Sequence, residues 1–218
     1  MDVQGNKLSD AMVLPRRPKL TIEQQVEHLK NKGVAFTLCT EEQAASFLAY
    51  STFFFKVKAF DKDYEINPKT GKYLNLDFAY LMELSTLDMH LRRLILHATL
   101  DLEHYLKVML IREISENPDE DGYEIVDRFF SVYPEVKASI SAKSENSMCC
   151  DLIRKLEKEG YAVWNLIEVL SFGDLVMLCE VYDQNTGGKN EDLFRCLFAV
   201  RCLRNAAAHN NCLLNSMR

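Results

Sequence analysis

The chain has 218 residues, a formal net charge of −6 and 48% hydrophobic residues, which is typical of a globular protein with its own core. The negative charge argues against a protein that coats nucleic acid non-specifically, because such binding relies on cations that neutralise phosphates. No apolar run approaches the ~20 residues of a membrane-spanning helix, and no signal peptide is visible. The seven cysteines show no disulfide pattern, so we expect a cytoplasmic protein with reduced thiols and no membrane partner.

The N-terminal region is predicted to be an arm followed by a helical hairpin. Residues 1–20 are expected to form a flexible arm, since two prolines among basic residues prevent a helix from starting there. Capping-box patterns that begin at Thr21 and Thr40 each predict a helix, the first ending at Gly33 and the second near Tyr50. The aromatic stretch 52–60 alternates like a strand, but a lone strand has no partner. We therefore favour an irregular or helical segment docked by its aromatic side chains.

The central region is predicted to contain one long helix. Residues 61–74 are rich in turn formers and predict a surface loop. Residues 76–116 then keep helical periodicity until Asn117-Pro118. About 30 helical residues span roughly 45 Å, so this helix should be the spine of a bundle.

Shorter helices are predicted after the spine, near residues 122–130, 148–159, 162–171 and 173–182. A break at Tyr133-Pro134, a mobile polar loop over 138–147 and a second loop over 183–190 separate them. A last helix is predicted to start near Glu191. The fold class is therefore all-α, with a hairpin and aromatic segment over 21–74 and a helical bundle over 75–218. We expect residues 21–218 to form one structural unit.

The strongest candidate site lies in the C-terminal segment 204–215, RNAAAHNNCLLN. The Arg204 guanidinium is a planar fork that suits phosphate, and the His209 imidazole titrates near neutral pH. On an ideal helix these side chains point about 140° apart and lie roughly 7.5 Å apart along the axis. They converge only if the helix bends or ends there, if the arginine curls round, or if a second chain completes the site. From residue 193 onward the chain has four arginines and no acid, which indicates an electropositive patch unless it reflects chance.

Three histidines repeat every seven residues along the predicted spine, at His90, His97 and His104. Such residues are about 10.5 Å apart along a helix, too far for one zinc ion, so a helix–helix contact face is the better interpretation. Glu103 beside His104 is either an exposed pair or an acid that supports the C-terminal site. No metal or other cofactor is expected.

Five segments in the same order resemble the Abi-like (abortive infection) bacterial family, a branch of the HEPN superfamily whose R-x4–6-H motif defines many ribonucleases. The C-terminal segment, with Arg204, Asn205, His209 and Asn215, is similar to the family's signature. The other similar segments are Lys19–Gln25, Phe54–Phe60, the spine with Asp88, Leu91-Arg92 and Asp101–Glu103, and Trp164–Leu175. The resemblance covers about residues 18–215.

This resemblance implies an all-α, HEPN-type helical bundle that acts as a metal-independent endoribonuclease and phage-defence toxin. It implies attack of the RNA 2′-hydroxyl on the adjacent phosphate, with His209 as general base or acid and Arg204 stabilising the phosphorane. Asn205 would orient His209 or bind the phosphate. It also implies a homodimer and a cognate RNA or protein antitoxin. Candidates for supporting roles or RNA contacts are Glu103, His104, Lys56, Arg201, Asn210 and Asn215.

The sequence also departs from the family pattern. Cys212 stands where members often have Arg, which removes a cation beside the site, and Leu214 stands where they often have Trp. Lys56 replaces an arginine, keeping the charge but losing the bidentate fork. The main alternative is therefore a non-catalytic helical RNA- or protein-binding module of the same fold. A purely structural helical scaffold is a third interpretation, but it leaves the C-terminal segment unexplained.

Overall fold

The structure is a computed structural model that describes residues 18–145 and 148–215; the rest of the predicted arm, residues 1–17, lies outside this part. The regular structure of these described residues consists of helices and turns, with two isolated β-bridges and no strand. The all-α prediction is therefore confirmed, and the HEPN-type arrangement stays a prediction. No helix among these residues is long and apolar enough to cross a membrane. The described residues divide into two compact units, 18–85 and 86–215.

Unit 1 contains the predicted hairpin of α1 (Ile22–Asn31) and α2 (Glu41–Tyr50). Both capping boxes are present: the Thr21 hydroxyl accepts from the Gln24 amide, and the Thr40 hydroxyl accepts from the Gln43 amide. The aromatic stretch is helical, as favoured from the sequence, and forms α3 (Phe54–Phe60) with a short 3-10 turn, η1 (Asp61–Asp63). These elements share a core of buried residues: Val26, Leu29, Ala44, Leu48, Val57, Phe60, Leu76, Phe78 and Leu81.

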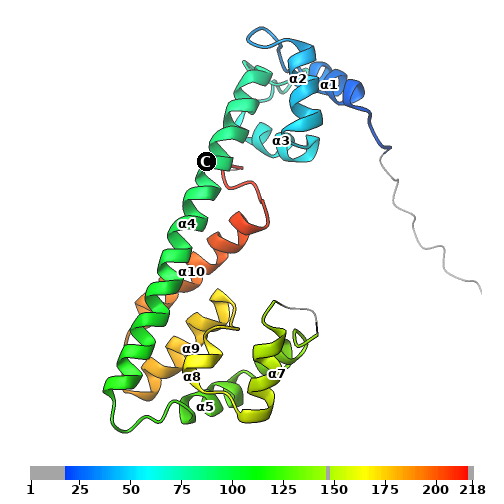
Figure 1. Cartoon of the computed structure of the whole chain (residues 1–218). Helices are drawn as coiled ribbons and strands as arrows, with labels where there is room; N and C mark the ends of the chain where they lie inside the picture. The colour runs from blue at the N-terminus through cyan, green and yellow to red at the C-terminus, as the bar shows by residue number, and fades with distance from the viewer. Residues whose placement is uncertain (1–17, 146–147, 216–218) are drawn as a thin grey trace, which may run out of the picture. The chain divides into compact units, whose positions relative to one another are not determined.

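Helix α4 (Phe78–Glu116) is the predicted long helix, 39 residues in one continuous element that contributes its first turns to unit 1 and the rest to unit 2 (Figure 1). Asp77 directly precedes it and accepts a hydrogen bond from the Ala79 amide at 3.0 Å, as an N-cap residue does. The C-terminal part of α4 places Leu106, Leu110 and Ile114 in the core of unit 2.

Unit 2 packs several shorter helices around the C-terminal end of α4 (Figure 1). They are α5 (Glu124–Val132), α6 (Pro134–Ser141), α7 (Cys150–Glu159), α8 (Val163–Leu166), α9 (Phe172–Asn185) and α10 (Glu191–Ala208). Their shared core includes Phe129, Ile153, Leu166, Leu175 and Leu197. Helix α10, which carries the candidate motif, packs against α9.

Two sequence-based predictions for unit 2 are wrong. Residues 138–141 belong to α6 rather than to a mobile loop, because Pro134 takes the first helical position, where a missing N–H costs nothing. The helix predicted over 162–171 is the single turn α8, because Ser171 is the N-cap of the next helix and accepts from the Asp174 amide. Residues 142–145 of the predicted loop form turns, and residues 146–147 lie outside the described residues.

Candidate functional site

The Arg204–His209 motif lies where α10 ends. The helix closes at Ala208, His209 caps it, and Asn210 adopts a left-handed conformation with φ of 59°. Backbone bonds from the amides of Asn210 and Asn211 back to Ala207 and Ala206 complete the turn. The helix thus ends at the histidine, as one of the three conditions set from the sequence required, but it is regular from Arg204 to Ala208, so convergence of the two side chains stays a prediction.

Asn205 contacts Arg204 and lies on the same side of the helix as His209. Arg204 Nη1 donates to Asn205 Oδ1 at 3.2 Å, so the guanidinium turns toward its neighbour. The His209 amide donates to the Asn205 carbonyl at 2.9 Å, so the two residues are one helical turn apart and share a face. Because Oδ1 of Asn205 accepts from Arg204, its NH₂ group remains as a donor at this face. Asn205 and His209 are exposed, and Arg204 is half-buried.

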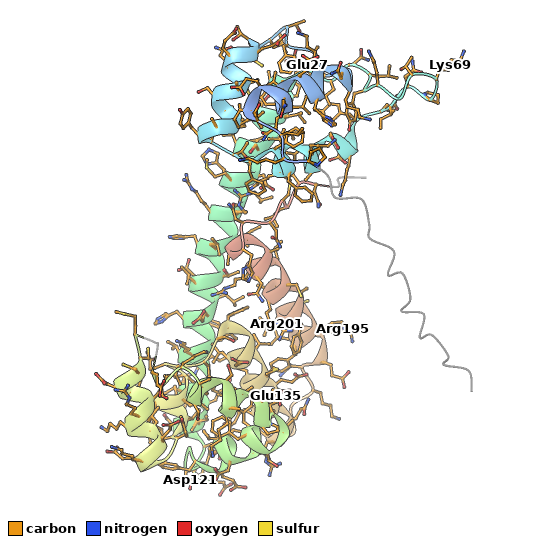
Figure 2. All side chains as sticks on the ribbon, turned by 90° about the vertical axis from the view of Figure 1, so that its right-hand side faces the viewer. Glu27, Lys69, Asp121, Glu135, Arg195 and Arg201 are labelled. Atoms are coloured by element: carbon orange, nitrogen blue, oxygen red, sulfur yellow. The ribbon has the colours of Figure 1, made fainter. Side chains whose placement is uncertain are left out.

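Positive charge continues along α10. Figure 2 shows Arg195 and Arg201 on this helix; Arg195 lies 3.4 Å from Asp192 in its first turn, and no acidic residue occurs between residue 193 and the end of the helix. The Arg201 guanidinium lies over the Phe198 ring, 5.1 Å from its centre. A Cβ on Gly173, in the first turn of α9, would lie 2.7 Å from Arg201 Cδ. Glycine at this position therefore leaves the space through which Arg201 runs. The fourth arginine of the segment, Arg218, lies outside the described residues.

The segment after the motif is anchored to α4 by Asp88. This side chain is completely buried, and its Oδ1 accepts from the amides of Leu213 at 2.6 Å and Leu214 at 3.0 Å. Arg92, one turn further along α4, forms an ion pair through Nη1 with Asp88 Oδ2. Burial lowers the pKa of the Arg92 guanidinium, while the nearby Cys212 acts in the opposite direction. Position 212, where the resemblance would place an arginine, is therefore close to an arginine from α4.

The other candidate residues are distributed over both units. Glu103 is half-buried and pairs with Lys107 of its own helix at 3.6 Å, and His104 beside it is exposed. Glu103 is 15 residues from Asp88, about 22 Å along the helix axis, so Asp88 is the α4 acid that contacts the C-terminal segment. Lys56 lies in unit 1 and is buried. Asn210 is exposed in the turn, and Asn215 is half-buried directly after the anchored residues.

The histidines of α4 do not come together. His90, His97 and His104 are all exposed, and the Nδ1 of His97 lies 3.9 Å from Asp101 Oδ2. Among the described residues, no three His, Cys, Asp or Glu side chains are placed to hold one metal ion. A helix–helix contact through these histidines would therefore have to involve another molecule.

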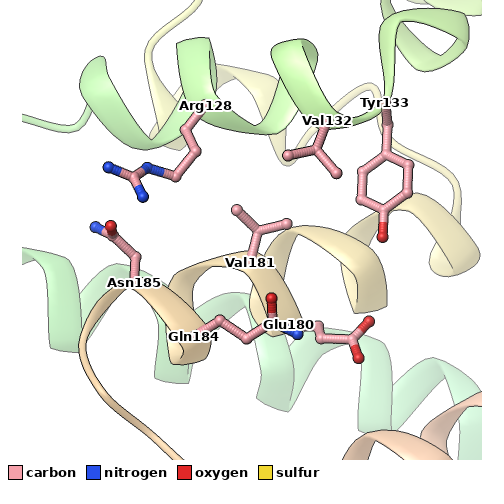
Figure 3. A pocket seen from close by; sticks show the side chains of 7 residues that line it. All are labelled: Arg128, Val132, Tyr133, Glu180, Val181, Gln184 and Asn185. Atoms are coloured by element: carbon pink, nitrogen blue, oxygen red, sulfur yellow. The ribbon is translucent and has the colours of Figure 1, made fainter.

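A small pocket lies elsewhere in unit 2, between α5 and α9. Figure 3 shows Val132 and Val181 facing each other across it, with polar side chains at both ends. Its lining consists of Arg128, Val132, Tyr133, Glu180, Val181, Gln184 and Asn185. Its volume of about 220 Å³ is below the range of roughly 300–1,000 Å³ typical of small-molecule sites. None of the residues singled out from the sequence lines it.

Sequence reasoning assigned no role to Asp88, Arg92 or Gly173. The Asp88–Arg92 spacing of four residues on a helix is a signal for an ion pair. Nothing in the sequence, however, indicates that backbone amides 125 residues away would bind the same carboxylate. Gly173 is the second residue of α9, and a glycine inside a helical pattern can mark a position of close packing.

These features define a class of protein: an all-helical chain whose last described helix ends in an Arg-x4-His turn tied back to a long helix. The chain belongs to the Abi-like protein family, which matches residues 46–215. This membership suggests a role in abortive infection. The match includes α3 to α10 and the motif, and it leaves the segment Lys19–Gln25 outside. No curated protein and no solved structure matches the chain.

Proposed function

We propose that this Abi-like protein is a metal-independent endoribonuclease whose site is built on Arg204, Asn205 and His209. The observation that carries the proposal is that Arg204 donates a hydrogen bond to Asn205, and that Asn205 lies one turn from His209 on the same face of α10. It gives a phosphate-binding cation, an amide donor and a proton-transfer group at one exposed helix end. A proton-transfer group and a fixed positive charge are contributions that can catalyse RNA cleavage without a metal.

In the proposed reaction, His209 of one site takes the proton from the RNA 2′-hydroxyl as O2′ attacks the adjacent phosphorus. The bond between phosphorus and O5′ then breaks, and O5′ receives a proton from an imidazolium or from water. The products carry a 2′,3′-cyclic phosphate and a 5′-hydroxyl. Arg204 stabilises the negative charge that develops on the phosphorane oxygens, and the NH₂ group of Asn205 donates to the phosphate or to His209.

The decisive experiment incubates the purified protein with single-stranded RNA in EDTA. Wild type should cleave RNA to 2′,3′-cyclic phosphate ends and leave the corresponding DNA intact. Arg204→Ala and His209→Ala should each lose about 10²–10³-fold in rate. His90→Ala, at an exposed histidine on α4, is the matched control and should cleave like wild type. Cleavage that persists in both motif variants would overturn the proposed site.

We also propose that the protein is a homodimer formed through one face of α4. This α4 face consists of Leu87, Leu94, Ala98, Tyr105 and Val108. All are exposed, and the four larger side chains are 51–67% accessible. Their spacing of seven, four, seven and three residues is the pattern by which helices pair in coiled coils. The face extends for about 32 Å along the helix, and unpaired apolar surface of this kind marks an interaction site.

A second copy fits this face in an antiparallel orientation. Parallel copies in register would set Asp101 against Asp101, two like charges in a partly desolvated seam. Antiparallel copies instead bring each Asp101 close to His97 of the other copy, which already lies 3.9 Å from Asp101 within its own chain. Charge complementarity and the heptad spacing therefore favour the antiparallel dimer.

Two measurements test the dimer and its site separately. Sedimentation should give twice the chain mass at micromolar concentration, and Leu94→Glu with Tyr105→Glu should give single chains. Mixing Arg204→Ala chains with His209→Ala chains then asks whether one site uses both copies. A shared site restores about a quarter of wild-type cleavage, since half of randomly mixed dimers carry one intact site of two. No recovery would place each site within one chain.

In the cell, we propose that cleavage of RNA arrests growth and that a cognate antitoxin, an RNA or a protein, holds the enzyme inactive. Expression of wild type alone should slow the host, whereas His209→Ala at the same protein level should not. Equal growth inhibition by both proteins would argue against toxicity through this site.

The alternative is a helical module of the same fold that binds RNA or protein without cleaving. The net charge of −6 and Cys212 in place of a cation favour it. It predicts a gel shift with RNA, or capture of a protein partner, and no new RNA ends in the assay above.

A further inference from the structure

We propose that Asp88 and Arg92 of α4 form a positioning pair for His209. The inference rests on the proposed function, because it concerns the same histidine. Asp88 does not contact the substrate in this proposal. It acts through the backbone of the segment that follows the motif, and it thereby fixes the direction of the imidazole.

His209 is held on both sides. On the N-terminal side, its amide bonds to the Asn205 carbonyl as part of α10. On the C-terminal side, the left-handed Asn210 reverses the chain, and the amides of Leu213 and Leu214 bind Asp88. Helix ends fray when nothing holds them, so a histidine at the C-cap needs the second attachment to keep one orientation.

The attachment of residues 213 and 214 to Asp88 is strong. The Asp88 carboxylate is completely buried, and hydrogen bonds from amides to an ionised carboxylate are stronger than those between neutral groups. Arg92, which is itself buried, supplies the opposite charge that a buried carboxylate requires. The pair therefore holds the two amides rigidly, whereas an exposed carboxylate would exchange them for water.

Helix α4 provides an internal comparison. Glu116 lies on the same helix and is exposed. If any charge on α4 influenced the site, Glu116→Gln would have the same effect as Asp88→Asn. A positioning role confined to the anchor predicts an effect of Asp88→Asn alone.

The experiment compares Asp88→Ala, Asp88→Asn, Arg92→Gln and Arg92→Lys with the control Glu116→Gln. Amide hydrogen exchange of residues 213 and 214 is followed by NMR, together with the resonances of the His209 ring. In Asp88→Ala these two amides should exchange at least about tenfold faster while the α10 amides stay protected. The kcat for RNA should fall about 10²-fold, the penalty of a misplaced catalytic group, with KM changed less than about threefold.

The conservative variants separate positioning from loss of fold. Asp88→Asn keeps an acceptor oxygen and should lose less than Asp88→Ala, and Arg92→Lys should recover much of what Arg92→Gln loses. These two variants decide the matter if Asp88→Ala does not fold. Unchanged exchange at residues 213 and 214, or wild-type kcat in folded Asp88→Ala, would overturn the proposal.

Failure of the proposed function is distinguishable from failure of this inference. If wild type cleaves no RNA, the ribonuclease proposal falls, while amide exchange and the His209 ring signal still report whether Asp88 orders this histidine. His209→Ala serves as the converse control: it should abolish cleavage and leave the amides of residues 213 and 214 protected.

Discussion

Two buried aspartates, Asp77 and Asp88, lie on either side of the boundary between the units. Both bind a loop that is distant in sequence, but the consequences that we expect differ. In unit 1, Asp77 Oδ2 accepts from the amide and hydroxyl of Thr37, at 2.8 and 2.7 Å, and from the Leu38 amide at 3.2 Å. In unit 2, Asp88 accepts from two amides of the segment after the motif and pairs with Arg92. Each carboxylate ties a remote loop to the long helix.

The difference lies in what the tied loop carries. The Thr37–Leu38 turn joins α1 to α2 and contains no candidate catalytic group. The segment held by Asp88 directly follows His209. We therefore expect Asp77 to matter for the stability of unit 1 alone, and Asp88 to matter for chemistry as well. Burial of a carboxylate does not by itself indicate function; the position of the groups that it binds does.

The largest expected effect separates the two aspartates directly. Asp77→Ala leaves the amides of Thr37 and Leu38 without their acceptor, so the free energy of unfolding should fall by about 3 kcal/mol. RNA cleavage per folded molecule should stay within about twofold of wild type, against the loss of about 10²-fold for Asp88→Ala. Urea denaturation and single-turnover cleavage measure both. If the folded Asp77→Ala protein also cleaved RNA slowly, the two aspartates would not differ in their effect on catalysis.

A smaller effect concerns acid. Burial opposes ionisation of Asp77, but hydrogen bonds from Thr37, Ala79 and Leu38 outweigh it and hold the pKa of this carboxyl below its ordinary value. A lowered pKa in the folded state contributes stability above the unfolded-state pKa of about 3.9, and this contribution is lost as pH falls through the folded pKa.

The urea concentration at which unit 1 is half unfolded should therefore decrease as pH falls from 6 to 3. Hydrogen exchange of the unit 1 amides measures this midpoint. Asp77→Asn has no charge to lose at this position and should show a shallower decrease. Equal slopes for the two proteins would mean that other carboxylates set the acid response.

The smallest effect concerns the contact between α10 and α9, where Arg201 passes over Gly173. Gly173→Ala gains up to about 1 kcal/mol of helix propensity, but its Cβ displaces the arginine, so the net change in stability should stay below about 1 kcal/mol. In an Arg201→Ala background the space is empty, and Gly173→Ala should become stabilising. Thermal unfolding of the four proteins in this cycle gives the sign of the stability change. If Gly173→Ala already stabilised the protein with Arg201 present, Arg201 would not be crowded at this position.

Local signals in the sequence predicted much of the fold. The capping residues Thr21 and Thr40 marked two helix starts correctly, and the helical period marked α4 to within two residues of its observed start. These features depend on side chains within a few positions of each other. Pro134 misled the prediction, because proline stops one helix and starts the next equally well.

The candidate site was predictable only in part. The residue types at 204, 205 and 209 indicated phosphate chemistry, and a helix end at this position was among the conditions considered from the sequence. The Asp88 anchor was not predictable, because its donors are backbone amides, which every residue except proline has. The exposed α4 face was hidden for a related reason: Leu87 and Leu106 follow the same helical period, and only the tertiary structure shows which of them is covered.

The sequence distance between Asp88 and Leu213 also has a consequence for folding kinetics. Individual helices form within about a microsecond, whereas a contact that closes a loop of 125 residues carries a large entropic cost and forms late. We therefore expect the histidine turn to become ordered in the slowest refolding phase, after most helical signal has returned. Stopped-flow refolding would then show circular dichroism recovering before activity, so a newly made chain would be helical before its histidine turn is ordered.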